Sequence, residues 1–132
     1  MPVSTYEANL IATAKAHGTA YQAPATLYLK LVTTQTTADT PGTEVTLGSY
    51  VPHTFAQSGW TNDAAGNLAL TADITYPLAT ADYDGDVLCV EAWDTADDSG
   101  HMREWYDLAS PLTVIAGQTP TILASDLTYG VS

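Results

Sequence analysis

The first part of the chain has the hydrophobic spacing of an α-helix. Leu10, Ile11 and Ala14 fall on one helical face, and Tyr6 lies one turn before Leu10. Alanine, a strong helix former, recurs through this stretch. The apolar face is narrow, which suits packing against a sheet edge or a neighbouring subunit better than forming a core of its own. We therefore predict a helix over roughly residues 4–17, with Tyr6, Leu10, Ile11 and Ala14 as interface residues.

Both ends of this predicted helix carry capping signals. Ser4 and Glu7 have the spacing of a capping box, in which the serine hydroxyl accepts from the Glu7 amide and the Glu7 carboxylate accepts from the Ser4 amide. Gly18 can take the left-handed conformation that ends a helix. His17, just before it, is placed to interact favourably with the helix dipole.

Beyond the helix the pattern changes to short β-prone segments. In Thr26–Thr33, Leu27, Leu29 and Leu31 share one face of an extended strand. Turn-forming residues separate the later runs. These runs are Glu44–Leu47, Tyr50–Phe55, Asn67–Tyr76, Val87–Trp93, Glu104–Leu108, Leu112–Ile115, Thr121–Leu123 and Leu127–Tyr129.

Short strands at this spacing, without a second helical pattern, predict a mainly β fold. We expect an antiparallel β-sandwich, immunoglobulin-like or jelly-roll-like, preceded by one short N-terminal α-helix. The chain then divides into a helical arm over residues 1–18 and a β-sandwich domain over residues 19–132.

Charge is scarce and unevenly distributed. Of 132 residues, 45% are hydrophobic and 14% charged, which is enough apolar material for a buried core. Three basic residues stand against fifteen acidic ones, so the net charge is -12. Residues 1–38 carry a net charge of +1 and residues 39–132 a net charge of -13. This balance argues against nucleic acid and against an anionic membrane as partners.

Little in the sequence indicates catalysis. The single Cys89 allows no internal disulfide, and its apolar neighbours predict a core position. His17, His53 and His101 lack the spacing of a zinc site. The motifs of serine hydrolases, phosphate-binding loops and dinucleotide folds are missing as well. We expect no enzymatic activity and no cofactor.

One acidic segment has the alternation of a calcium loop. Asp82, Asp84 and Asp86 can direct carboxylates at one hard cation. An EF-hand also needs glycine at its sixth position and glutamate at its twelfth, where this chain has Val87 and Trp93. We therefore predict no metal and interpret the segment as an acidic turn, with the three aspartates as the candidates if a cation binds.

Aromatic residues offer a second candidate chemistry. Three tryptophans and eight tyrosines lie mostly near predicted strands and turns. Such rings can stack on sugars, but they are also enriched in cores and subunit interfaces. We favour packing over a carbohydrate-binding platform.

Several segments, in order along most of the chain, resemble a family of small virion proteins of tailed phages, often labelled tail fibre or minor structural proteins. The similar segments are Gly18–Leu29, Thr33-Thr34, Gly42–Val45 with Gly48–Tyr50, Pro77–Asp82 and Ala116–Pro120. The family has no catalytic residues to carry over.

The resemblance implies a non-catalytic virion structural protein. We expect an external capsid decoration or cement protein that self-associates as a trimer and docks on the shell through its arm. The alternatives are a tail fibre or tail-tip subunit, and a carbohydrate-binding module for host attachment. Its partners would be the major capsid protein or tail proteins, and neither nucleic acid nor a membrane.

The same resemblance places the protein on the virion surface after synthesis in the host cytoplasm. The opening residues lack the basic segment, followed by an apolar segment, that is typical of a secretory signal peptide. No run of about 18 apolar residues is present either.

Overall fold

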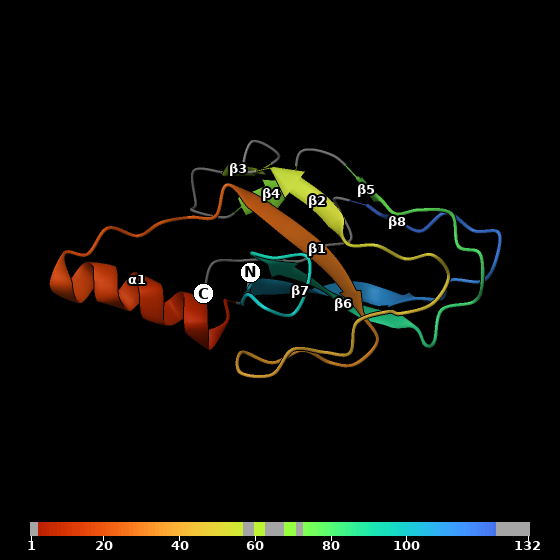
Figure 1. Cartoon of the computed structure of the whole chain (residues 1–132), viewed down its shortest axis with the longest axis horizontal. Helices are drawn as coiled ribbons and strands as arrows, with labels where there is room; N and C mark the ends of the chain where they lie inside the picture. Colours follow the sequence, from red (N-terminus) through yellow and green to blue (C-terminus); the bar gives the residue numbers. More distant parts are fainter. Residues whose placement is uncertain (1–2, 57–59, 63–67, 71–72, 124–132) are drawn as a thin grey trace.

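The computed structural model describes residues 3–56, 60–62, 68–70 and 73–123 (Figure 1). Its one helix in this part of the chain, α1 (Thr5–His17), comes first. The strands follow as β1 (Thr26–Val32), β2 (His53–Ala56), β3 (Trp60–Asn62), β4 (Leu68–Leu70), β5 (Ile74–Thr75), β6 (Val87–Trp93), β7 (Met102–Leu112) and β8 (Thr121–Ile122). Every strand pairing among them is antiparallel. The predicted mainly β fold with one short N-terminal helix is confirmed.

A four-stranded sheet in the order β2-β1-β6-β7 is the centre of the fold. The pairs β3-β4 and β5-β8 form two smaller sheets. In Figure 1, α1 projects from one end of the molecule, whereas the loops that follow β5 and β7 lie at the opposite end. The molecule is therefore elongated, with the helix and these loops at its two extremities.

The main core lies on the inner face of the large sheet. Alternation places Leu27, Leu29 and Leu31 of β1 on this face, as the sequence predicts. Ile74 of β5 and Ile122 of β8 belong to the same buried cluster, so the small sheet covers the large one. This two-layered packing is that of a β-sandwich. The remaining buried members are Val45, Tyr76, Ala79, Tyr83, Val87, Val90, Ala92, Tyr106 and Val114.

The outer face of the same sheet carries a second apolar cluster. Val32, Cys89 and Trp93 are buried there together with Met102 and Trp105. Cys89 is fully buried, as predicted, and burial raises the pKa of its thiol. Because both faces are covered, the central strands are buried on both sides.

The predicted strands between β1 and β6 are shortened or divided in the structure. Glu44–Leu47 contributes only an isolated bridge between Val32 and Glu44, because Gly48 and Ser49 turn the chain with positive φ angles of 75° and 62°. A Cβ on Gly48 would lie 2.8 Å from a backbone oxygen, so glycine is required there. Tyr50–Phe55 becomes β2 only after Pro52, which has no amide hydrogen to donate.

Other boundaries differ in a similar way. Asn67–Tyr76 is divided between β4 and β5, which belong to different sheets. Conversely, the predicted run Glu104–Leu108 extends in both directions into β7, whereas Leu112–Ile115 contributes only its first residue to that strand. Val87–Trp93 is confirmed as β6, and Thr121–Leu123 is confirmed as β8 except for its last residue. Leu127–Tyr129 lies outside the described residues.

Strand β7 is an edge of the large sheet and pairs irregularly along its length. Its register with β6 shifts between Val87 and Cys89, opposite the segment that contains Pro111. An edge strand tolerates a proline at such an irregularity, where the regular ladder is already interrupted. The other edge, β2, is only four residues long.

Two buried tyrosines provide a matched test of this core. The Tyr76 hydroxyl donates to the Leu29 carbonyl at 3.0 Å, whereas the Tyr83 hydroxyl is buried without a partner in the described part of the chain. We expect Tyr76→Phe to lower the free energy of unfolding by about 1 kcal/mol, because the Leu29 carbonyl loses its donor. Tyr83→Phe should leave it unchanged or raise it. Urea unfolding of both variants measures this, and equal losses would contradict it.

Candidate interaction site at the base of the helix

The ends of α1 are capped largely as the sequence predicts. The Ser4 hydroxyl accepts from the Glu7 amide at 3.0 Å. At the other end Gly18 adopts the left-handed conformation with φ 67°, and its amide donates to the Ala14 carbonyl at 3.1 Å. The helix therefore begins and ends where local sequence signals place it.

The second half of the predicted capping box is wrong. The Ser4 amide donates to the Arg103 carbonyl of β7 at 2.9 Å instead of to Glu7. The Glu7 carboxylate is turned the other way, toward the Arg103 guanidinium and the Tyr21 hydroxyl. A cation on a neighbouring strand is a stronger partner for a carboxylate than an amide that already has an acceptor.

Arg103 is the centre of an ion-pair network at the base of the helix. Its Nη1 lies 2.8 Å from Glu7 Oε2, and its Nε lies 3.2 Å from Asp94 Oδ2. The side chains of Glu7 and Arg103 are 8% and 11% exposed, so this pair is shielded from water. The Glu7 carboxylate also accepts from the Tyr21 hydroxyl, and burial together with this carboxylate raises the tyrosine pKa. One arginine thus joins the helix, β7 and the loop after β6.

Aromatic stacking and backbone bonds complete the attachment. The Tyr6 ring lies parallel to the His101 ring, with the two centroids 3.7 Å apart. The Arg103 guanidinium carbon is 5.2 Å from the centroid of the Tyr6 ring, within the range of a cation–π contact. The Thr5 amide donates to the Ala38 carbonyl at 3.0 Å. All of these contacts involve the first helical turn.

The four predicted interface residues extend along the helix from this attached end. Tyr6 contacts His101 within the same chain, although it remains 37% exposed. Ile11 is also 37% exposed, and Leu10 and Ala14 are half-buried. Their role in contacts with another subunit remains a prediction.

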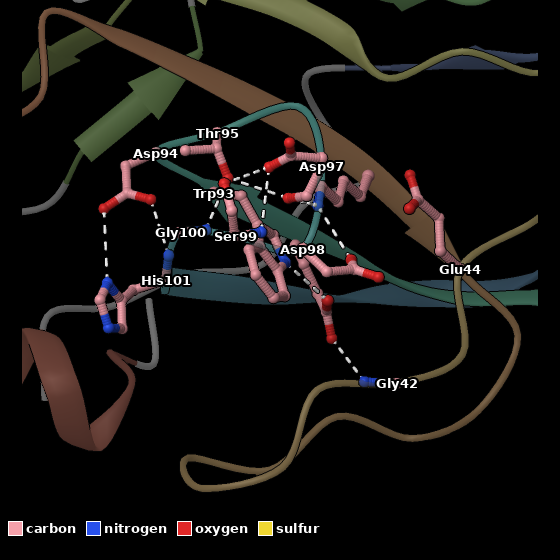
Figure 2. Close-up of polar contacts among 12 residues, drawn as sticks. Gly42, Glu44, Trp93, Asp94, Thr95, Asp97, Asp98, Ser99, Gly100 and His101 are labelled. Carbon is pink, nitrogen blue, oxygen red and sulfur yellow. Dashed lines mark hydrogen bonds and ion pairs between the residues drawn. The ribbon is translucent and has the colours of Figure 1, made fainter.

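A buried polar cluster supports the loop on which the helix rests (Figure 2). Lys30 of β1 is 1% exposed, and its Nζ donates to the Asp97 carbonyl at 2.8 Å and lies 3.8 Å from the centroid of the Trp93 ring. Glu91, its cross-strand partner, accepts from Trp93 Nε1 at 2.9 Å and from the Gly42 amide at 2.6 Å. Both charges are compensated, as burial requires.

The loop between β6 and β7 is held mainly by its own aspartates. Asp97 Oδ1 accepts from the Ser99 amide at 3.0 Å and Asp94 Oδ1 from the His101 amide at 2.7 Å, as Figure 2 shows. These are the Asx-type bonds typical of tight loops. His101, at the end of the loop, is exposed.

Two adjoining pockets lie beside this loop. One, of about 320 Å³, is lined by Tyr6 and His101 among others, and the second, of about 330 Å³, by Lys30 and Glu44. Both share Pro41 and Trp93. The Trp93 ring offers little stacking surface, because it is 8% exposed and the chain's own ammonium lies over it. The Trp93 face is therefore unavailable for stacking on a sugar, and the Tyr6 ring at the first pocket already stacks on His101.

The other aromatic side chains support the packing interpretation. Trp105, Tyr76, Tyr83 and Tyr106 are at most 9% exposed and belong to the two apolar clusters. The side chain of Trp60 and the whole of Tyr129 fall outside the described residues.

The three aspartates of the predicted acidic turn do not converge. Asp82 Oδ1 accepts from the Ala116 amide at 2.9 Å, and Asp86 Oδ1 accepts from the Thr113 hydroxyl at 2.8 Å. Asp84 is exposed. Over the described ranges, no group of three acidic, histidine or cysteine side chains could hold a metal ion. The Asp82 and Asp86 carboxylates therefore connect the β5–β6 loop to the segment that follows β7.

Sequence reasoning missed Arg103, Asp94, His101 and Tyr21 as partners of the helix. One signal was available, because Arg103 is the only basic residue among fourteen acidic ones in residues 39–132. A single cation among so many carboxylates is expected to form an ion pair with one of them, but the sequence does not identify that partner.

Comparison with known proteins identifies a family. The family model described as Podophage GP4 fiber I protein gp80 matches residues 2–130. No curated protein matches the chain. Among the residues that the structure describes, no helix is long and apolar enough to cross a bilayer.

The Glu7–Arg103 pair predicts a non-additive effect on stability. Arg103→Ala leaves the buried Glu7 carboxylate without its cation and should lower the free energy of unfolding by about 3 kcal/mol. Adding Glu7→Gln removes the orphaned charge, so the double variant should be more stable than Arg103→Ala alone. Chemical unfolding of both single variants and the double variant gives the coupling energy. Strictly additive losses would mean that the two charges do not interact.

Glu104, the neighbour of Arg103 on β7, predicts a pH dependence. Burial, reinforced by the nearby Glu7 and opposed by a hydrogen bond from the Tyr106 hydroxyl, raises the Glu104 pKa to about 7. Between its unfolded pKa, about 4.3, and this value the folded state binds more protons, so stability falls as pH rises. Glu104→Gln should therefore stabilise the protein by about 1–3 kcal/mol at about pH 8 and much less at about pH 4. Urea unfolding at both pH values tests this, and an equal effect at both would contradict it.

Proposed function

The chain belongs to the family of podophage GP4 fiber I protein gp80, and from this premise we propose that it is a non-catalytic structural subunit of a phage fibre. The match over residues 2–130 of 132 is the observation that carries the proposal. The family description names a fibre protein, so a tail fibre now takes precedence over the capsid decoration protein expected from the sequence.

The geometry of the helix supports a role in assembly. Its contacts to the rest of the chain are concentrated in the first turn, and the residues beyond Glu7 are exposed or half-buried. A helix of 13 residues is marginally stable in water without tertiary contacts. We infer that the arm of residues 1–18 gains further contacts from another virion subunit, through Leu10, Ile11 and Ala14.

The partners follow from this role. We propose other tail proteins and further copies of this chain, with a homotrimer as the expected oligomer and the virion surface as the location. Synthesis would take place in the host cytoplasm. Capsid decoration, with the major capsid protein as partner, is the second candidate because an exposed arm suits docking on a shell equally well.

A carbohydrate-binding module has less support. In the pockets beside the β6–β7 loop, Trp93 is covered by Lys30, and the partly exposed Tyr6 ring already stacks on His101. The scarcity of positive charge, three basic residues in all, gives no support to binding of nucleic acid.

The location of the protein in virions tests the proposal. Purified particles are labelled with an antibody against this chain and imaged by electron microscopy. We expect label on the tail. Label spread over the shell would replace the fibre by the decoration protein, and its absence from particles would overturn both.

The arm has its own test, with a matched control on the opposite side of the helix. Ile11→Asp places a charge on the predicted interface, whereas Ala12→Asp places the same charge on an exposed position pointing elsewhere. Each variant is supplied in trans during infection, and its amount per particle is measured by mass spectrometry. We expect about a tenfold loss of incorporation for Ile11→Asp and little change for Ala12→Asp. Equal incorporation would rule out docking through this face.

A further inference from the structure

The end of the molecule opposite α1 carries a set of exposed apolar side chains. Leu47, Val51, Leu78 and Ile115 are 48%, 55%, 55% and 49% exposed. They come from the three loops that join β1 to β2, β5 to β6 and β7 to β8. Exposed large apolar residues gathered at one end of a protein mark a surface for interaction.

These three loops form one continuous structure. The Thr80 amide donates to the Gly48 carbonyl at 3.1 Å, and the hydroxyls of Ser49 and Thr80 lie 2.7 Å apart. The Gly117 amide donates to the Ala79 carbonyl at 2.8 Å, which adds the third loop. We call this surface, with Leu47, Val51, Leu78 and Ile115, the distal end.

Negative charge lies beside the distal end. Asp82, Asp84 and Asp86 are exposed on the same β5–β6 loop. Asp82 accepts from the Ala116 amide and Asp86 from the Thr113 hydroxyl, which holds this loop beside the β7–β8 loop. Of the three basic residues in the chain, Lys30 and Arg103 are bound at the base of the helix. A partner for this surface must therefore be apolar and carry positive charge.

The helix of the same protein has this combination. Its only acidic residue, Glu7, is buried against Arg103, so the rest of α1 has no negative side chain. Ile11 and Lys15 are both exposed and lie one turn apart on the same side. Lys15 is the one Lys or Arg of the chain outside the buried polar contacts described above, and His17 follows it in the last turn.

We propose that α1 of one copy docks on the distal end of a neighbouring copy, with Ile11 against its apolar residues and Lys15 facing Asp84. This inference rests on the proposed function and names the partner of the arm as a second copy of this chain. Contacts between two distal ends would bring carboxylates together, and contacts between two helices would bring the lysines together. A head-to-tail contact avoids both, and it forms either a closed ring or an open row of copies.

Mixing two single variants tests this contact. Ile11→Asp disables the helix but keeps the distal end, and Leu78→Asp disables the distal end but keeps the helix. Sedimentation velocity of the full chain should show association for the wild type, monomers for each variant alone, and dimers that grow no further for the equimolar mixture. Association of either variant on its own would indicate a symmetric contact and overturn the proposal, and so would a mixture that stays monomeric.

Exchanging the two charges provides a second, independent test of this contact. Lys15→Glu and Asp84→Lys should each weaken association about tenfold, and mixing the two should restore part of it because the opposite charges then meet again. Asn9→Asp, on a side of the helix away from Ile11 and Lys15, and Thr40→Asp on the β1–β2 loop are exposed controls that should associate like the wild type. Circular dichroism of each variant verifies that it is folded.

The outcomes also separate this inference from the proposed function. Wild-type protein that remains monomeric at all concentrations overturns the head-to-tail contact. Labelling of virions is measured separately, so tail label combined with a monomeric protein would overturn only the inference. Protein that associates as proposed but is absent from particles would overturn only the fibre assignment.

Discussion

The attachment of the helix to the sheet depends on one guanidinium. Arg103 lies between Glu7 of α1 and Asp94 of the β6–β7 loop, and its backbone carbonyl accepts from the Ser4 amide. The chain has three basic and fifteen acidic residues, so few of its carboxylates can pair with a Lys or Arg of the same chain. Placing it here fixes the direction in which the helix leaves the body, while the rest of α1 remains available for other contacts.

The second buried cation has a comparable role on the outer face of the sheet. Lys30 and Glu91 are cross-strand partners, yet each is satisfied chiefly by other groups, namely the Asp97 carbonyl and the Gly42 amide. The pair therefore fixes two loops against the sheet, one on each side of Trp93. These loops in turn receive the first turn of the helix through the Ala38 carbonyl and the His101 ring. Sheet, loops and helix form one connected polar scaffold.

Local signals in the sequence predicted local structure well. Propensity and periodicity act over a few residues, and they correctly predicted the helix ends at Ser4 and Gly18 and the strands Thr26–Val32 and Val87–Trp93. The site at the base of the helix did not follow, because it joins Glu7 to Arg103 and Tyr6 to His101 across most of the chain. The capping-box prediction was wrong for the same reason: a distant cation competed successfully for the Glu7 carboxylate.

The irregular edge strand has a consequence for the behaviour of the protein at high concentration. Regular edges invite the strands of neighbouring molecules to add on without limit, which leads to aggregation. Here Pro111 removes a donor from β7, the register shift interrupts its ladder, and Val3 bridges to Glu104 near its start. With β2 only four residues long, neither border offers a long template for amyloid-like stacking, even at high local concentration.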